Sequence, residues 1–248
     1  MRLLVVALIA ALGITAVAVA QTNSYSIDAK VPSGGSKKKP KAGGFTFNFT
    51  VADQAGANIP QVIQTYSLGI EGSKVNTNVV PTCAASKAAT DDSVCSKKAL
   101  IGTGSITAVD GSAGQPLDSR AADCVLDLRI YNGGKNKATI FVQQKAEPAG
   151  NCAGAVPGQA IDAKWTKANG GTALVFTVPE VLRHPVANTD AVVIAVTSKF
   201  KKITKTIKHK KVGYFESIGC KDKSRTVTAT FTDEKGDAVP YSTDIGKC

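Results

Sequence analysis

The chain has 248 residues, of which 30 are lysine or arginine and 19 are aspartate or glutamate, so its formal net charge is +11. A strongly basic chain favours anionic partners. Aromatic residues make up only 6% of the sequence. Because single strands of nucleic acid are normally bound through stacking aromatics as well as cations, this composition argues against nucleic-acid binding.

The first twenty residues have the order of a secretory signal peptide. Arg2 is followed by an apolar run that ends in Ala18-Val19-Ala20, which matches a charged start, an apolar centre and a small-residue cleavage site. A membrane anchor is the alternative, because an apolar run of about 18 residues can span a bilayer. We expect cleavage after Ala20, which leaves 228 residues (248 − 20). The sequence thus predicts export, with no transmembrane segment after cleavage.

Period-two alternation of apolar and polar residues recurs along the mature chain and predicts half-buried strands. It is clearest in residues 25–31 and 45–51, on either side of a Lys/Gly-rich segment at residues 32–44. We interpret that segment as a solvated hairpin loop rather than a linker, because the strand before it needs a partner. Further strands are predicted at residues 61–70, 100–109, 124–131, 138–144, 160–164, 172–178, 191–199, 202–208, 212–218 and 226–232.

Turn sequences such as Asp110-Gly111 and Asn169-Gly170 separate these strands. Helical periodicity is scarce, and only short helices are predicted, around residues 84–89 and 179–183. Many short strands with regular turn signals indicate a sandwich or a barrel. We therefore expect an all-β fold, with residues 21–248 forming one antiparallel β-sandwich domain of immunoglobulin-like or jelly-roll-like type.

The six cysteines predict a disulfide framework, since an even number of cysteines in an exported chain is typical of disulfide-stapled proteins. We favour sequential pairing, because each pair then brackets a short segment whose ends can lie close. The last pair would also hold the terminal residue, which otherwise frays. Cysteines at ligand spacing from one another or from a histidine do not occur, so we expect no metal site. The expected pairs are Cys83–Cys95, Cys124–Cys152 and Cys220–Cys248.

Motifs that carry catalysis are missing from the sequence. No serine has glycine at both −2 and +2, as the nucleophile elbow of α/β-hydrolases requires. Ser-x-x-Lys occurs at residues 36–39 and 198–201, but the accompanying β-lactamase motifs are absent. His184 and His209 form no catalytic or metal-binding spacing, and we interpret both as surface residues. We expect neither catalytic residues nor a cofactor.

The acidic residues offer two further candidate sites, a calcium loop and a pair of catalytic carboxylates. Residues 233–237 superficially resemble a calcium loop, but they lack its alternating oxygen ligands and distal glutamate and lie where a hairpin turn is expected. The paired carboxylates of a glycoside hydrolase are spatial neighbours and leave no sequence pattern. A single tryptophan, Trp165, and five tyrosines supply few aromatic platforms for a sugar-cleaving cleft. A polysaccharide hydrolase therefore stays a minor alternative.

The most basic stretch is residues 199–211, with seven lysines in thirteen residues. One interpretation is an anion-binding strand pair, joined by the lysines of residues 37–41. The other is edge protection, since lysines on exposed strands discourage edge-to-edge aggregation, and on sequence alone we favour it. The candidate anion-binding residues are Lys199, Lys201, Lys202, Lys205, Lys208, Lys210 and Lys211.

Short motifs follow one another in a combined order: Lys-Lys-Lys-Pro-Lys at 37–41, Val-Pro-Thr-Cys at 80–83, Leu-Ile-Gly-Thr-Gly-Ser at 100–105, Ile-Tyr-Asn-Gly-Gly at 130–134 and Lys-Val-Gly-Tyr at 211–214. In this order the chain resembles a group of uncharacterised secreted proteins of high-GC Gram-positive, actinobacterial-type bacteria. The resemblance implies a secreted, disulfide-bearing β domain and brings no activity. Ser96 departs from it, since a proline is expected after the second cysteine.

These patterns predict a non-enzymatic β domain, secreted or associated with the cell envelope, with a structural or ligand-binding role. The first alternative is a basic module that binds an anionic cell-wall or extracellular polymer through residues 199–211. Whether the β core encloses a cavity is the structural feature that separates a ligand-binding role from the others.

Overall fold

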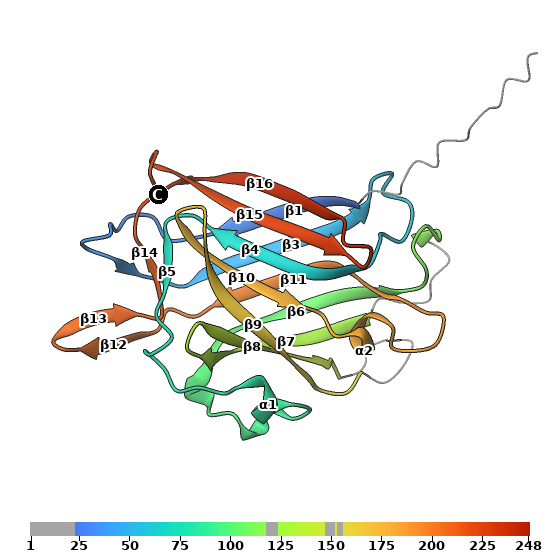
Figure 1. Cartoon of the computed structure of the whole chain (residues 1–248), viewed down its shortest axis with the longest axis horizontal. Helices are drawn as coiled ribbons and strands as arrows, with labels where there is room; N and C mark the ends of the chain where they lie inside the picture. Colours follow the sequence, from blue (N-terminus) through green and yellow to red (C-terminus); the bar gives the residue numbers. More distant parts are fainter. Residues whose placement is uncertain (1–22, 118–123, 147–151, 153–155) are drawn as a thin grey trace, which may run out of the picture.

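The computed structural model describes residues 23–117, 124–146, 152 and 156–248 (Figure 1). The predicted signal peptide, residues 1–20, lies outside the described residues. Within the described part, no helix has the length and apolar character needed to cross a bilayer.

Eleven strands form one antiparallel sheet in the order β1-β3-β11-β6-β7-β8-β9-β10-β4-β15-β16. Non-sequential neighbours such as β3 and β11 show that the chain crosses over repeatedly. The strands are β1 (Asn23–Lys30), β3 (Phe45–Asp53), β4 (Ile63–Ile70), β6 (Leu100–Asp110), β7 (Cys124–Gly134), β8 (Lys137–Gln144), β9 (Gln159–Ala168), β10 (Gly171–Thr177), β11 (Ala191–Phe200), β15 (Ser224–Asp233) and β16 (Ala238–Lys247).

Smaller elements decorate this sheet. β2 (Lys41–Ala42), β14 (Phe215–Ser217) and β5 (Ser73–Val75) make a three-stranded sheet, and β12 (Thr204–Ile207) pairs with β13 (Lys210–Gly213) in a projecting hairpin. The short helices are α1 (Ala85–Ala88), α2 (Glu180–Arg183) and two single 3₁₀ turns, Asp92–Val94 and Lys97–Ala99.

The sheet curls until its outermost strands, β1 and β16, come into contact (Figure 1). On the inside, Tyr25 of β1 stacks on Phe231 of β15 with ring centroids 4.1 Å apart, which closes the seam. Gly104 of β6 marks a close approach between β6 and β11, since a Cβ there would overlap the carbonyl oxygen of Thr197. The predicted all-β antiparallel fold is confirmed, and its sheet is barrel-like rather than a plain sandwich.

The alternation that predicts the strands also decides which side chains enter the barrel. In β3, Phe45, Phe47, Phe49 and Val51 are buried and belong to the main core, while the residues between them are more exposed. Successive side chains of a strand point to opposite faces. The apolar face of each strand therefore turns inward, and the core lies inside the curled sheet.

Three disulfides join Cys83–Cys95, Cys124–Cys152 and Cys220–Cys248, with Cα atoms 5.5, 4.3 and 5.7 Å apart. This is the sequential pairing that the sequence favoured. The first closes the segment that carries α1, which packs against the outer face of the sheet beside Phe141 and Tyr131. The third fastens the last residue of the chain.

The barrel has two different ends (Figure 1). At the α2 end lie α2 and the turn between β15 and β16, residues 234–237. At the opposite end, which we call the lysine end, lie the β1–β3 connection (31–44), the β12–β13 hairpin and the C-terminus.

Candidate functional site

An apolar cavity of about 170 Å³ lies inside the barrel. Its wall is built by inward-facing side chains of β3, β4 and β6 to β11. Ile106 of β6 lies opposite Val196 of β11 on one side and Leu126 of β7 on the other. A β-bulge between Val193 and Ala195 inserts one residue, which is why Val193 and Val196 both line the cavity.

Part of the cavity wall is less well buried than some outward-facing side chains of the same strands. Ile106, Val193 and Val196 are only half-buried although they face the interior. Val109 and Val192 face outward, yet they are 0% and 1% exposed because Ile59 covers them. The interior is therefore not filled by its own side chains.

Aromatic rings close the cavity toward the lysine end. Phe45 stacks on Phe200 with centroids 4.1 Å apart and contacts Phe215 at 4.3 Å. Trp165 meets Phe200 edge-on at 6.3 Å. Stacked and tilted ring pairs of this kind pack densely, so the cavity has a firm apolar floor.

Tyr66 is the phenol in the cavity wall. Its ring stacks on Phe176 with centroids 5.1 Å apart, and it is only 2% exposed. Burial raises the pKa of Tyr66 well above its ordinary value. The phenol is therefore uncharged at neutral pH, and it gives the apolar wall one neutral polar group.

At the α2 end, the cavity lining passes from apolar to charged residues. Leu182 and Arg183 of α2 line it, together with Asp110 at the end of β6. α2 follows Pro179, whose fixed φ of −58° suits the entry to a helical turn. It is a single turn, so contacts from its flanks must hold it in place.

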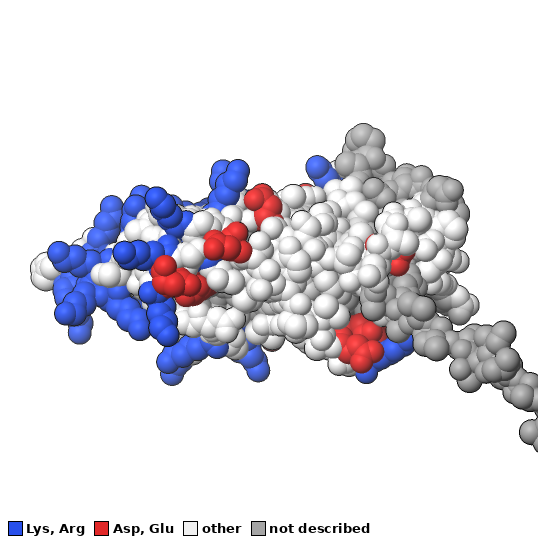
Figure 2. Space-filling model, turned by 90° about the horizontal axis from the view of Figure 1, so that it is seen from above, with Lys and Arg blue, Asp and Glu red and all other residues white. Residues whose placement is uncertain are grey.

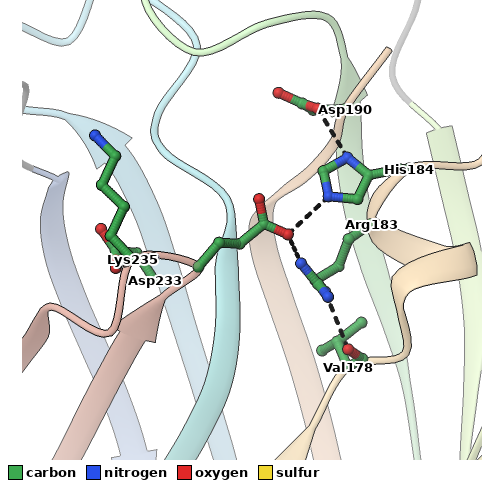
Figure 3. Close-up of polar contacts among 7 residues, drawn as sticks. Val178, Arg183, His184, Asp190, Asp233 and Lys235 are labelled. Carbon is green, nitrogen blue, oxygen red and sulfur yellow. Dashed lines mark hydrogen bonds and ion pairs between the residues drawn. The ribbon is translucent and has the colours of Figure 1, made fainter. Parts of the chain in front are cut away.

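Four charged or ionisable side chains hold this turn, and we call them the rim cluster: Arg183, His184, Asp190 and Glu234 (Figure 3). Arg183 forms an ion pair with Glu234, and its Nε donates to the carbonyl oxygen of Val178 at 3.1 Å. His184 lies between Asp190, at 2.9 Å from Nδ1, and Glu234, at 2.7 Å from Nε2.

Within the rim cluster, the imidazole of His184 is held on both sides. Nδ1 faces a carboxylate oxygen of Asp190 and Nε2 faces one of Glu234. Sequence reasoning missed this cluster and treated His184 as one of two surface histidines. His209 is exposed in the β12–β13 turn, whereas the side chain of His184 is 33% exposed and held on both sides.

Residues 233–237 form the hairpin turn that the sequence favoured over a calcium loop. Asp233 Oδ1 accepts hydrogen bonds from the backbone N–H groups of Lys235 and Asp237, both at 2.9 Å. The carboxylate therefore caps its own turn. Among the residues that the structure describes, no group of three His, Cys, Asp or Glu side chains is arranged to hold a metal ion.

The seven candidate lysines are all exposed at the lysine end. Lys199 lies on β11, Lys205 on β12 and Lys208 in the following turn, and the others lie beside them. Figure 2 shows Lys and Arg gathered at this end of the face that it presents. The structure thus brings the predicted lysines to one end, away from α2.

Comparison with known proteins assigns no role to the cavity or to the lysine end. No protein-family model matches the chain, and no curated protein matches it significantly.

Proposed function

We propose that this is an exported protein that binds a small apolar molecule inside its barrel, without transforming it. The apolar cavity carries the proposal. It is walled by regular strands, floored by stacked rings and bordered by a held helical turn, which is how ligand sites of small β-barrels are built.

The energetics favour an occupant. At about 24 cal/mol per Å³ of void, an empty cavity of about 170 Å³ lowers the free energy of unfolding by about 4 kcal/mol relative to a filled core. Atoms that line a void lose dispersion contacts on one side. A ligand of matching shape restores those contacts and stabilises the folded state by mass action.

Size and polarity define the ligand class. An apolar cavity of about 150 Å³ accepts a molecule such as benzene, so a cavity of about 170 Å³ suits one aromatic ring or a short alkyl chain. The lining favours an uncharged body, since an ion would lose its hydration there. The neutral phenol of Tyr66 suits one hydrogen-bonding group on the ligand.

Export is supported by the N-terminal sequence and by the covalent framework. Disulfides persist in oxidising compartments, and three of them staple this chain. A binding role outside the cytoplasm also agrees with the resemblance to secreted β proteins. The proposal assigns no chemical step, because the described lining presents Asp110 and Arg183 as its only charged side chains.

A matched pair of substitutions tests the proposal. Ile106 points into the cavity, while Thr107 beside it points outward. The ¹⁹F NMR signal of fluorobenzene, an uncharged probe with one aromatic ring, should shift and broaden on binding to the wild-type protein. Ile106→Trp should reduce probe affinity at least about tenfold by filling the space, which corresponds to about 1.4 kcal/mol, and Thr107→Trp should leave it unchanged.

The opposite results would overturn the proposal. Equal affinity in wild type and Ile106→Trp would place the probe outside the barrel. Failure of the wild-type protein to bind any of a series of benzene, naphthalene and short alkyl compounds would show that the cavity has no ligand of this class. Circular dichroism of both variants checks that the fold is retained.

A further inference from the structure

The lysine end carries a high density of cations that the protein does not neutralise. Residues 199–211 contain seven lysines and no acidic residue. Among the residues that the structure describes, Lys137 is the one lysine within 4.0 Å of a carboxylate, at 3.8 Å from Asp162. The charge of residues 199–211 is therefore exposed to solvent without a counter-charge from the described chain.

Two carboxylates near the C-terminus accept hydrogen bonds from neighbouring groups. Asp244 accepts hydrogen bonds from the hydroxyl of Ser224 and from the N–H of Gly246, and these bonds lower its pKa. Asp222 accepts from the N–H of Ser224 at 3.1 Å. These acidic groups cap local turns and do not pair with the lysines.

The β12–β13 hairpin is fixed at its base. Glu216 is only 4% exposed, and its two oxygens accept from Gly213 N–H and Asn76 Nδ2, both at 2.9 Å. Tyr214 N–H donates to the carbonyl oxygen of Ile203. These bonds close the hairpin and, through Asn76, join its base to the segment that follows β5, so its lysines are presented on an ordered support.

The tip of the hairpin places cations where small residues would be less strained. Lys208 and His209 have φ angles of +48° and +61°. Such two-residue turns normally carry Asn-Gly or Gly-Gly, because side chains crowd the backbone at positive φ. The hairpin retains basic side chains in this conformation.

A second basic loop lies at the same end. β2 pairs with β14, which brings Lys41 opposite Ser217. The Ser217 hydroxyl donates to the carbonyl oxygen of Gly34, and Gly34 N–H donates to that of Cys248. The three exposed lysines of residues 37–39 therefore extend the basic surface.

Edge protection accounts for only part of this arrangement: β12 and β13 form a two-stranded sheet in which both strands are edges, so Lys205, Lys210 and Lys211 fit that role. Lysines that protect a sheet lie on its edge strands, and the main sheet ends at β1 and β16. Lys201 and Lys202 lie between strands, and the lysines of residues 37–39 lie in a loop. Their shared feature is position at one end of the molecule rather than at an edge.

We propose that the lysine end binds a linear phosphate-bearing polymer. Membrane insertion lacks support, because the exposed large apolar residues of the described chain, Val94, Val181, Val186 and Val239, lie outside the basic segments. Nucleic acid would need aromatic platforms, and Tyr214 and Phe215 are buried at 2% and 3% exposure. A chain of phosphates without bases fits an array of solvated point charges.

The test measures binding to long-chain inorganic polyphosphate, independently of the cavity. A four-lysine variant, with Lys201, Lys202, Lys205 and Lys208 changed to Gln, is compared with a charge-matched control in which Lys87, Lys97, Lys98 and Lys145 are changed to Gln. All eight side chains are exposed, and the two variants have the same net charge.

If seven lysines contact the polymer, raising the salt concentration from about 50 to 200 mM should weaken wild-type binding about a thousandfold, because each contact releases counterions. The four-lysine variant should lose most of its affinity and lower the slope of log K against log salt by about 3. The control should keep both values. The slope for the wild-type protein is measured without any substitution, so this part of the test does not depend on whether a variant folds.

Three outcomes would overturn the inference. Equal losses in the variant and the control would show that net charge alone binds polyphosphate. Binding to vesicles of phosphatidylcholine and phosphatidylglycerol without binding to polyphosphate would assign the surface to a membrane. Absence of salt-dependent binding to polyphosphate would leave the lysines with a solubility role.

Discussion

His184 Nε2 lies 2.7 Å from Glu234 Oε1, although the two residues are 50 positions apart in the chain. The contact joins the end of α2 to the turn between β15 and β16 (Figure 3). Because Glu234 also forms an ion pair with Arg183, whose side chain is 10% exposed, one carboxylate holds both residues that follow Leu182. The rim cluster thereby fixes the helical turn that borders the cavity.

Glu234→Gln should loosen α2. The substitution removes the charge that pairs with Arg183 and leaves a buried guanidinium poorly compensated, which costs about 1–3 kcal/mol in the free energy of unfolding. The ¹⁹F NMR line shapes should show fluorobenzene dissociating about tenfold faster, as a loss of about 1.4 kcal/mol implies. Glu180→Gln, an exposed acid on the same turn, is the control. Unchanged dissociation in Glu234→Gln would show that α2 does not border the ligand's path.

Buried tyrosines should make the fold sensitive to alkali. The pKa values of Tyr25, Tyr66, Tyr131 and Tyr214 are raised above 10.0, chiefly by burial. Their stabilisation is complete below pH 10 and is lost as the pH rises, because the unfolded phenols ionise while the folded ones stay neutral. Each group then changes the free energy of unfolding by about 1.4 kcal/mol per pH unit.

Urea titrations at several pH values above 9 measure this loss. Tyr66→Phe should reduce the slope of the free energy of unfolding against pH by about 1.4 kcal/mol per pH unit, the contribution of one phenol. Tyr241→Phe, on edge strand β16, is the matched control. The same slope in Tyr66→Phe and wild type would show that the Tyr66 phenol is not protected from ionisation.

Removal of the third disulfide should destabilise the lysine end. Cys220 and Cys248 are 28 residues apart, and a closed loop of that length contributes about 3.6 kcal/mol in the chain-entropy model. Cys248 also contacts Arg225, whose guanidinium is buried at 1% exposure and also bonds to Ser217. Loss of the bridge therefore disturbs a buried cation as well.

The experiment compares two double Cys→Ser variants by urea denaturation. The variant lacking Cys220–Cys248 should lose more stability than the one lacking Cys83–Cys95, whose separation is 12 residues and whose expected contribution is about 2.8 kcal/mol. A larger loss from the shorter loop would contradict the assigned role of the C-terminal bridge.

Most strands could be predicted from the sequence, because alternation of apolar and polar residues is a local signal. β16 was missed, since Pro240 interrupts it and its residues are mostly exposed. Proline is tolerated there because β16 is an edge strand. An exposed edge leaves no strong pattern in its own sequence.

Closure of the sheet and the cavity could not be predicted. Alternation tells which face of a strand is buried, but curvature arises from the summed twist and coiling of eleven strands and from close approaches such as that at Gly104. The rim cluster could not be predicted for a similar reason, because His184 and Glu234 are 50 residues apart in the chain and only the fold brings them together. The lysines were visible in the sequence, whereas their gathering at one end depends on the chain's crossovers.

Anomalous diffraction from crystals soaked with iodobenzene tests the central claim most directly, because the iodine atom reports its own position. We expect one strong peak inside the barrel, close to Ile106, Leu126 and Val196, and its loss in crystals of Ile106→Trp. Iodine peaks confined to the outer surface, with none inside the barrel, would contradict the account of this protein as a carrier of a small apolar ligand.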